Sequence, residues 1–173
     1  MSGYKVKYTI GISIYSMFCA LVVLMQSSGL LVLKIENASV FLALLLVVYA
    51  GYYFGEYGAA VIGLLMGAAT DVYSSTYCFN TLMLTVIVFV SGILISYLFN
   101  RNFSAAVVLN IVASAVYFFM KWLIVYAFSD PAAGFVLVSF TLPSFLFTGV
   151  VGILTYFIIN PILKRIPVIP SKR

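Results

Sequence analysis

Charged side chains are nearly absent from the long middle of this sequence. Between residues 8 and 160 the chain carries seven charged residues, and the remaining ones stand at its two ends. The apolar stretches between them are long enough, at about 20 helical residues, to cross a hydrocarbon core roughly 30 Å thick. A water-soluble globule is excluded, because 65% of the residues are hydrophobic and 8% are charged, which leaves too little polar surface to face water. We therefore expect an all-α integral membrane protein.

The charges and the turn-forming residues divide the chain into six expected helices within a single transmembrane domain, residues 1–173. The helices are expected at about residues 8–26, 39–54, 57–73, 79–99, 103–128 and 135–160. The stretch 39–73 is divided because, at about 1.5 Å per residue, it would be roughly 50 Å long, which is too long for one crossing. Gly55, Glu56, Tyr57 and Gly58 can form the tight turn. Pro143 is expected to kink the last helix and Pro161 to end it.

The basic residues predict the orientation of the bundle. If both termini are cytoplasmic, seven of the nine basic residues lie on the cytoplasmic side, as the positive-inside bias predicts for an even number of spans. These seven are Lys5, Lys7, Arg101, Lys164, Arg165, Lys172 and Arg173. The expected location is therefore a cell membrane, with several passes and both ends inside.

A cleavable signal peptide is an alternative interpretation of the first segment. Lys5 and Lys7 precede the apolar run 10–25, and the small residues 27–29 could stand near a cleavage site. The run is long for the apolar part of a signal peptide. Its removal would leave five spans and an external N-terminus.

Nothing in the sequence assembles a catalytic or metal-binding group. There is no histidine, and the four acidic residues are isolated from one another: Glu36, Glu56, Asp71 and Asp130. Acid–base chemistry and metal ligation in proteins mostly use histidine or grouped carboxylates. We therefore expect no enzyme activity, no catalytic or metal-ligating residue, no cofactor and no nucleic-acid partner.

Two charged residues fall inside the expected helices. A charge in hydrocarbon costs a few kcal/mol on insertion scales, so it is usually paired, interfacial or functional. Asp71 lies near the outer end of one helix and Lys121 in the outer third of another, close enough in depth for a lysine side chain to bridge. One hypothesis is an intramembrane pair between them. In the alternative, Lys121 reaches the outer headgroups beside Trp122 and Tyr126, and Asp71 caps a helix end.

Small residues recur every four positions along the same stretch. Ala59, Gly63 and Gly67 are followed at the next step by Asp71, so all four lie close to one helix face. Small residues at this spacing let another helix backbone approach closely in lipid. This stripe is a candidate contact for a partner helix, and packing within the same bundle is the alternative.

These residues also resemble the central motif of the rod shape-determining protein MreD family. The matching segments here are Gly55-Glu-Tyr-Gly58, Gly63-Leu-Leu-Met-Gly67, Asp71-Val-Tyr-Ser and Phe79-Asn-Thr-Leu. Gly92, the basic turn at Arg101, Pro143 and the ending at Pro161, Lys164 and Arg165 extend the likeness over essentially the whole chain. One position departs from the pattern, because Cys78 stands where the family has a loop glycine.

The resemblance implies a non-catalytic inner-membrane component of the bacterial cell-elongation machinery that helps organise peptidoglycan synthesis. Its implied partner is the single-span MreC scaffold, and through it MreB filaments and the peptidoglycan polymerase and transpeptidase. The family is also similar in architecture to the six-helix S components of energy-coupling factor transporters.

A substrate-binding S component of a vitamin transporter is therefore the alternative function. Such proteins bind a vitamin from the outer side, and an outer pocket here could be lined by Asn80, Tyr77, Trp122, Tyr126 and Asp71. The sequence has few polar groups to bind a hydrophilic vitamin, and tyrosines in membrane proteins mostly form interfacial belts.

Overall fold

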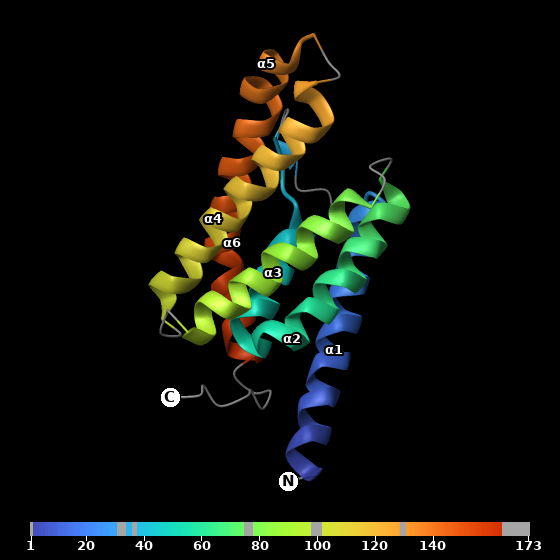
Figure 1. Cartoon of the computed structure of the whole chain (residues 1–173), viewed down its shortest axis with the longest axis vertical. Coiled ribbons are helices and arrows are strands. Elements are labelled where there is room, and N and C mark those ends of the chain that lie inside the picture. Colours follow the sequence, from blue (N-terminus) through green and yellow to red (C-terminus); the bar gives the residue numbers. More distant parts are fainter. Residues whose placement is uncertain are drawn as a thin grey trace.

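The computed structural model describes residues 2–30, 34–35, 38–74, 78–97, 102–128 and 131–163. Apart from one short hairpin, the described chain is a bundle of long helices (Figure 1). Within these described ranges, five helices are long and apolar enough to cross a membrane: Tyr8–Ser27, Leu42–Tyr73, Phe79–Tyr97, Phe103–Ala127 and Ala133–Pro161. The structure therefore agrees with an all-α membrane protein. Several residues used in the sequence analysis lie outside the described ranges: Glu36, Tyr77, Arg101, Asp130 and the residues from Lys164 onward.

The elements follow one another with short connections. They are α1 (Ser2–Ser27), β1 (Lys34–Ile35), β2 (Ala38–Ser39), α2 (Leu42–Tyr73), α3 (Phe79–Tyr97), α4 (Phe103–Trp122), the π-helical segment η1 (Leu123–Ala127), α5 (Ala133–Val136), the π-helical segment η2 (Leu137–Thr141) and α6 (Leu142–Leu163). The two strands pair antiparallel, with Lys34 opposite Ser39. Figure 1 shows α4 and α6 side by side, and η1, α5 and η2, which connect them, extend beyond the other helices at one end.

Helix α2 is broken at Gly55, where the backbone has φ 73° and ψ −177°. This conformation is essentially restricted to glycine, because a Cβ would clash with the backbone. Gly51 and Gly63, one on each side of the break, both lie against Val88 of α3. Twelve residues of straight helix would separate them by about 18 Å. The chain therefore folds back at Gly55, within the turn that the sequence predicts.

Tyrosine hydroxyls surround this break. Backbone and side-chain acceptors in an apolar bundle need a donor, because no water is present to supply one. Tyr8 of α1 donates to the Phe54 carbonyl (2.7 Å), and Tyr52 and Tyr53 of α2 donate to the Asn102 carbonyl (3.3 Å) and to the Asn160 side chain. The break, the start of α4 and the end of α6 thus meet at one end of the bundle, which we call the Gly55 end.

The segment before α2 differs from the prediction. A helix was expected from residue 39, but residues 38–41 are extended and α2 begins at Leu42. Side chains of α6 bind this backbone: the Ser39 N–H donates to Ser144 Oγ (3.1 Å) and the Phe41 N–H to Thr148 Oγ1 (3.3 Å). Non-helical backbone can lie within a membrane bundle where the protein satisfies its polar groups in this way. The acceptors on α6 take up these backbone N–H groups, which explains why the helix starts late.

The prolines of the last predicted helix also behave differently from expectation. Pro161 does not end the helix but lies within α6, which continues to Leu163. Pro143 is the second residue of α6, and α6 follows η2 directly. A proline ring clashes with the carbonyl four residues earlier, which here belongs to Ser139 within η2. The wider π-helical turn accommodates that clash, so the irregularity predicted at Pro143 takes the form of a π-helical segment.

We predict that Gly55→Ala destabilises the fold although there is room for the added methyl group. No described atom lies within 4 Å of a Cβ at this position, so the cost arises from the positive φ alone, and we expect it to be about 1–3 kcal/mol. Gly149→Ala in α6 is the matched control, because its added methyl is equally unobstructed and its φ is not positive. Thermal unfolding in detergent measures both. Equal melting temperatures for the two variants would contradict a strained break at Gly55.

Candidate functional site

The small-residue stripe of α2 packs against α3. A Cβ on Gly63 would lie 2.5 Å from Val88 Cγ1 and 3.1 Å from the Leu84 carbonyl oxygen. A Cβ on Gly67 would overlap Thr81 Cα and lie 2.8 Å from the Thr81 nitrogen. Ala59, on the same stripe, is fully buried. The stripe is therefore an internal contact between two helix backbones, and the prediction that it receives a partner helix is wrong.

Asp71, at the end of this stripe, caps the start of α3. Its Oδ1 accepts the Asn80 N–H (3.1 Å), and its Oδ2 accepts the Thr81 N–H (2.7 Å) and the Thr81 hydroxyl (2.6 Å). The first N–H groups of a helix have no intrahelical acceptor, and the helix dipole places partial positive charge there. The Asp71 carboxylate of α2 thus accepts the hydrogen bonds that an N-cap residue of α3 would otherwise accept. We call this end of the α2–α3 pair the Asp71 end.

Asn80 extends the polar contact from α3 to α4. Its side-chain NH2 donates to Ser74 Oγ (2.9 Å), and the Tyr117 hydroxyl donates to its Oδ1 (2.6 Å). Asn80 and Tyr117 are almost completely buried. Asn80 therefore joins helices. The sequence had instead suggested that Asn80 lines an outer pocket, and it does not line the cavity described below. The bond also ties the Asp71 end of α3 to α4.

The hypothesised pair between Asp71 and Lys121 does not form. Both carboxylate oxygens of Asp71 are engaged at the start of α3. Lys121 is half-buried and lines a cavity between α4 and α6. The stated alternative is correct for Asp71 in that it caps a helix end, although the helix is the following one.

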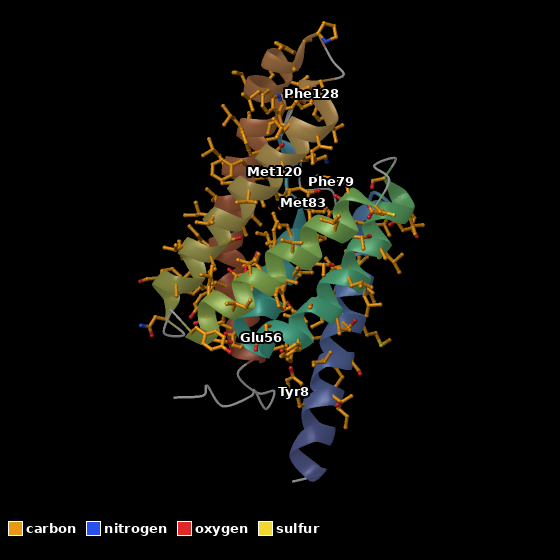
Figure 2. All side chains as sticks on the ribbon, in the orientation of Figure 1. Tyr8, Glu56, Phe79, Met83, Met120 and Phe128 are labelled. Atoms are coloured by element: carbon orange, nitrogen blue, oxygen red, sulfur yellow. The ribbon has the colours of Figure 1, made fainter. Side chains whose placement is uncertain are left out.

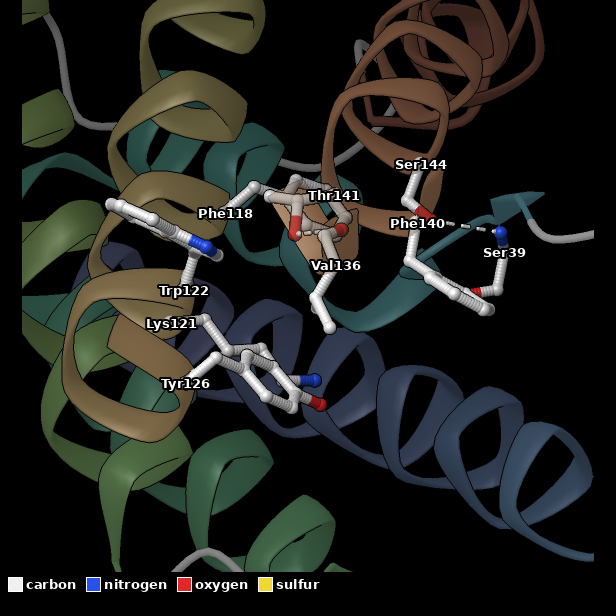
Figure 3. Close-up of a pocket in the computed structure, with 9 residues that line it drawn as sticks. All are labelled: Ser39, Phe118, Lys121, Trp122, Tyr126, Val136, Phe140, Thr141 and Ser144. Carbon is white, nitrogen blue, oxygen red and sulfur yellow. Dashed lines mark hydrogen bonds between the residues drawn. The ribbon is translucent and has the colours of Figure 1, made fainter. Parts of the chain in front are cut away.

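This cavity has a volume of about 360 Å³ and opens between α4, η1, η2, α6 and the extended segment before α2. Its lining residues are Ser39, Phe118, Lys121, Trp122, Tyr126, Val136, Phe140, Thr141 and Ser144 (Figure 3). Trp122 and Tyr126 are therefore at a pocket, as predicted. Tyr77 lies outside the described residues, and Asn80 and Asp71 belong to the neighbouring helix contact. We call this space the lysine cavity.

A second cavity, of about 290 Å³, lies beside the first. It is lined by Ala115, Phe118, Phe119, Leu137, Thr141, Leu142 and Phe145. Phe118 and Thr141 line both spaces, so the two cavities adjoin. Nearly all of the lining of the second cavity is apolar, and we call it the apolar cavity.

Sequence reasoning missed the buried polar residues of α4 and α6. Asn110 and Ser114 are fully buried, and their side chains have no hydrogen-bond partner among the described residues. A Cβ on Gly152 of α6 would collide with the Asn110 amide, so this glycine makes the space for it. On α6, Ser144 and Thr148 bind the extended segment. The sequence does contain a pattern that could have identified them: Asn110 and Ser114, and likewise Ser144 and Thr148, are polar residues four positions apart in otherwise apolar segments.

Comparison with protein-family models, with curated proteins and with solved structures found no match to this chain. Within the described residues no three of the histidine, cysteine, aspartate and glutamate side chains group as metal ligands would. Among the polar side chains described above, those of Asp71, Asn80 and Tyr117 bond one helix to another. The helix contact at Asp71 and the two cavities are therefore the candidate sites.

The capping role predicts the outcome of Asp71→Asn. An asparagine offers one acceptor oxygen, so its NH2 group must face one of the two backbone N–H donors of α3, whichever way the amide is turned. Loss of a charge-assisted bond should lower the free energy of unfolding by about 1.5–3 kcal/mol. Because Lys121 shares no partner with Asp71, Lys121→Met should add to this loss within about 0.5 kcal/mol. Unfolding of both single variants and the double variant measures the coupling.

Recovery of stability in the double variant would contradict this assignment and restore the ion pair. Asp71→Glu is a useful control, because it keeps the charge but places the two oxygens one methylene further from α3.

Proposed function

We propose that this protein is a non-catalytic, multi-pass component of the bacterial cell-elongation machinery, similar to the MreD family. In this role it binds a single-span scaffold of the MreC kind and helps organise peptidoglycan synthesis, with MreB filaments and the polymerase and transpeptidase as indirect partners. The observation that carries the proposal is the convergence of the motif residues on one contact. Gly63 and Gly67 bring α2 against α3, and Asp71 caps α3. The residues that resemble the family thus form one structural unit.

The proposed topology has six crossings in a bacterial inner membrane. Five helices are long and apolar enough to span, and α2 reverses at Gly55. We call residues 42–54 the first arm of α2 and residues 56–73 the second arm. If each arm crosses the membrane separately, the Gly55 end faces the cytoplasm together with both chain termini. Figure 2 shows Glu56 and Phe79 at opposite ends of the α2–α3 pair, as this topology requires. Ser96 Oγ donates to the Glu56 carboxylate (3.2 Å), so the end of α3 returns to the Gly55 end.

The partner must bind elsewhere than on the glycine stripe, because α3 covers that face. Exposed apolar side chains continue along α1, among them Ile14, Met17, Phe18 and Leu21. Lipid or a partner helix can cover such a surface. The partner experiment below therefore uses the whole protein and not an isolated helix.

A second candidate is an S component of a vitamin transporter, and the lysine cavity is the observation that favours it. The cavity is large enough for a small ligand, and Lys121, Trp122 and Tyr126 line it. Its polar groups are few for a hydrophilic vitamin. This candidate predicts association with a transmembrane coupling subunit and paired ATPases, which the elongation proposal does not.

The proposed topology predicts where reporter fusions are active. Fusions after Arg173 and within the connection around Arg101 should report a cytoplasmic location, and a fusion near Asp130 should report an external one, because the basic residues favour the inside. A paired cytoplasmic and periplasmic reporter at each site provides the control. An external C-terminus would overturn the six-crossing proposal.

Depletion and purification distinguish the two candidate functions. Depletion in a rod-shaped bacterial host should cause rounding, and protein purified in mild detergent should recover a single-span protein with a periplasmic coiled coil. The Gly149→Ala variant is a folded control that should restore shape as well as the original protein does. Normal shape after depletion, with recovery of paired ATPases and loss of vitamin uptake, would instead support the transporter.

A further inference from the structure

Lys121 places a cation in a cavity without an acidic counterpart in the described structure. Of the two acidic residues described, Asp71 is bound to the start of α3 and Glu56 to Ser96 at the other end of that helix. Moving a lysine from water into a bundle of apolar helices is costly unless an anion or a polar group accompanies it. The lysine cavity therefore has a charge that an anionic ligand would complement.

The polar groups around Lys121 are arranged to meet such a ligand. In Figure 3 the Lys121 and Tyr126 side chains point the same way, so that the amine and the hydroxyl lie on the same side of the cavity. Ser144 Oγ accepts the Ser39 N–H, which leaves the Ser144 hydroxyl hydrogen available as a donor. An ammonium group with nearby hydroxyls is a suitable environment for a phosphate.

The apolar cavity next to it indicates that the ligand is amphiphilic. Phe118 and Thr141 separate the two spaces and line both of them. A free inorganic anion would use Lys121 and leave the apolar cavity empty. A lipid would place its headgroup at Lys121 and part of an acyl chain against Phe119, Leu142 and the other apolar side chains.

The backbone around the cavities is irregular at three places. η1 carries Tyr126, η2 carries Phe140 and Thr141, and the extended segment before α2 carries Ser39. π-Helical segments inside α-helices are rare and frequently occur at functional sites, since they cost regular hydrogen bonding. Here two π-helical segments, η1 and η2, line the same cavity, and their wider turns change the direction of the side chains that line it.

We propose that the lysine cavity and the apolar cavity together bind one anionic phospholipid, with its phosphate at Lys121 and an acyl chain in the apolar cavity. This ligand site is independent of the partner that the proposed function assigns, because it lies between α4 and α6 and uses none of the motif residues. The lipid occupies the lysine cavity and the apolar cavity and takes part in no reaction.

The single tryptophan of the chain allows binding to be measured directly, since Trp122 lines the lysine cavity. Purified whole protein in a neutral detergent is titrated with phosphatidylglycerol, phosphatidylcholine or inorganic phosphate while Trp122 fluorescence is recorded. We expect a saturable response to phosphatidylglycerol, an affinity for phosphatidylcholine at least roughly tenfold weaker, which is about 1.4 kcal/mol, and no response to inorganic phosphate. Phosphatidylglycerol with brominated acyl chains should quench Trp122.

Variants of Lys121 test whether its positive charge is what binds the lipid phosphate. Lys121→Met should weaken phosphatidylglycerol binding roughly tenfold or more, and Lys121→Arg should retain it, because the charge is what the phosphate meets. Lys7→Met on α1 removes the same charge elsewhere and should leave the affinity unchanged. Leu142→Phe, which narrows the apolar cavity and adds no second tryptophan, should weaken lipid binding while Lys121 is intact.

Three results would overturn the proposal. They are equal affinity for phosphatidylcholine and phosphatidylglycerol, saturable binding of inorganic phosphate with the affinity of the lipid, and unchanged affinity in a folded Lys121→Met protein. If Lys121→Met does not fold, the comparison of the three ligands on the unaltered protein still decides. Failure here leaves the elongation proposal untouched, because that proposal is decided by partner recovery and cell shape.

Discussion

The close contact between the backbones of α2 and α3 is the constraint on which the rest of the bundle depends. Gly63 and Gly67 allow the second arm of α2 to approach α3 more closely than any side chain would permit, and Gly92 allows α3 to approach the break beside Glu56. In lipid there is no hydrophobic drive between helices, so such close packing supplies much of the attraction. The reversal at Gly55 then brings the first arm against the same helix, and α1, α4 and α6 assemble around this unit.

The second constraint is that every polar group within the bundle needs a partner. Asp71 at the start of α3, Asn80 with Tyr117, and the tyrosines around Gly55 all satisfy it by bonding between helices. Such bonds are specific in direction, so they fix the register of helices that dispersion alone would hold less precisely. The region between α4 and α6 departs from this rule, because it contains Lys121 and because Asn110 and Ser114 have no hydrogen-bond partner among the described residues. It is also where the cavities lie, which is why we place ligand binding there and not at the motif.

The helical class, the approximate spans and the reversal near Gly55 could be predicted from the sequence, because apolar length, charge position and glycine placement act locally. The small-residue stripe was also visible, but its partner was not, since four-residue spacing is the same for an internal and an external helix. The Asp71–Lys121 hypothesis used depth alone and was wrong, because depth does not include the N–H groups at the start of α3, which donate to the Asp71 carboxylate. The extended segment 38–41 depends on Ser144 and Thr148, which are more than 100 residues away along the chain, and no local pattern contains that information.

Labelling of three exposed positions from each side of the membrane tests the reversal of α2. Tyr57, Tyr73 and Tyr97 are all exposed; Tyr57 lies just after the Gly55 break, Tyr73 is the last residue of α2, and Tyr97 is the last residue of α3. Single cysteines at these positions, with Cys19 replaced by Ala and Cys78 by Ser, can be labelled with a membrane-impermeant maleimide from either side of sealed vesicles. The reversal of α2 at Gly55 predicts that cysteines at positions 57 and 97 react from one side of the membrane and a cysteine at position 73 from the other. A cysteine at position 57 that reacts from neither side would show that α2 crosses as one helix, and would contradict the account.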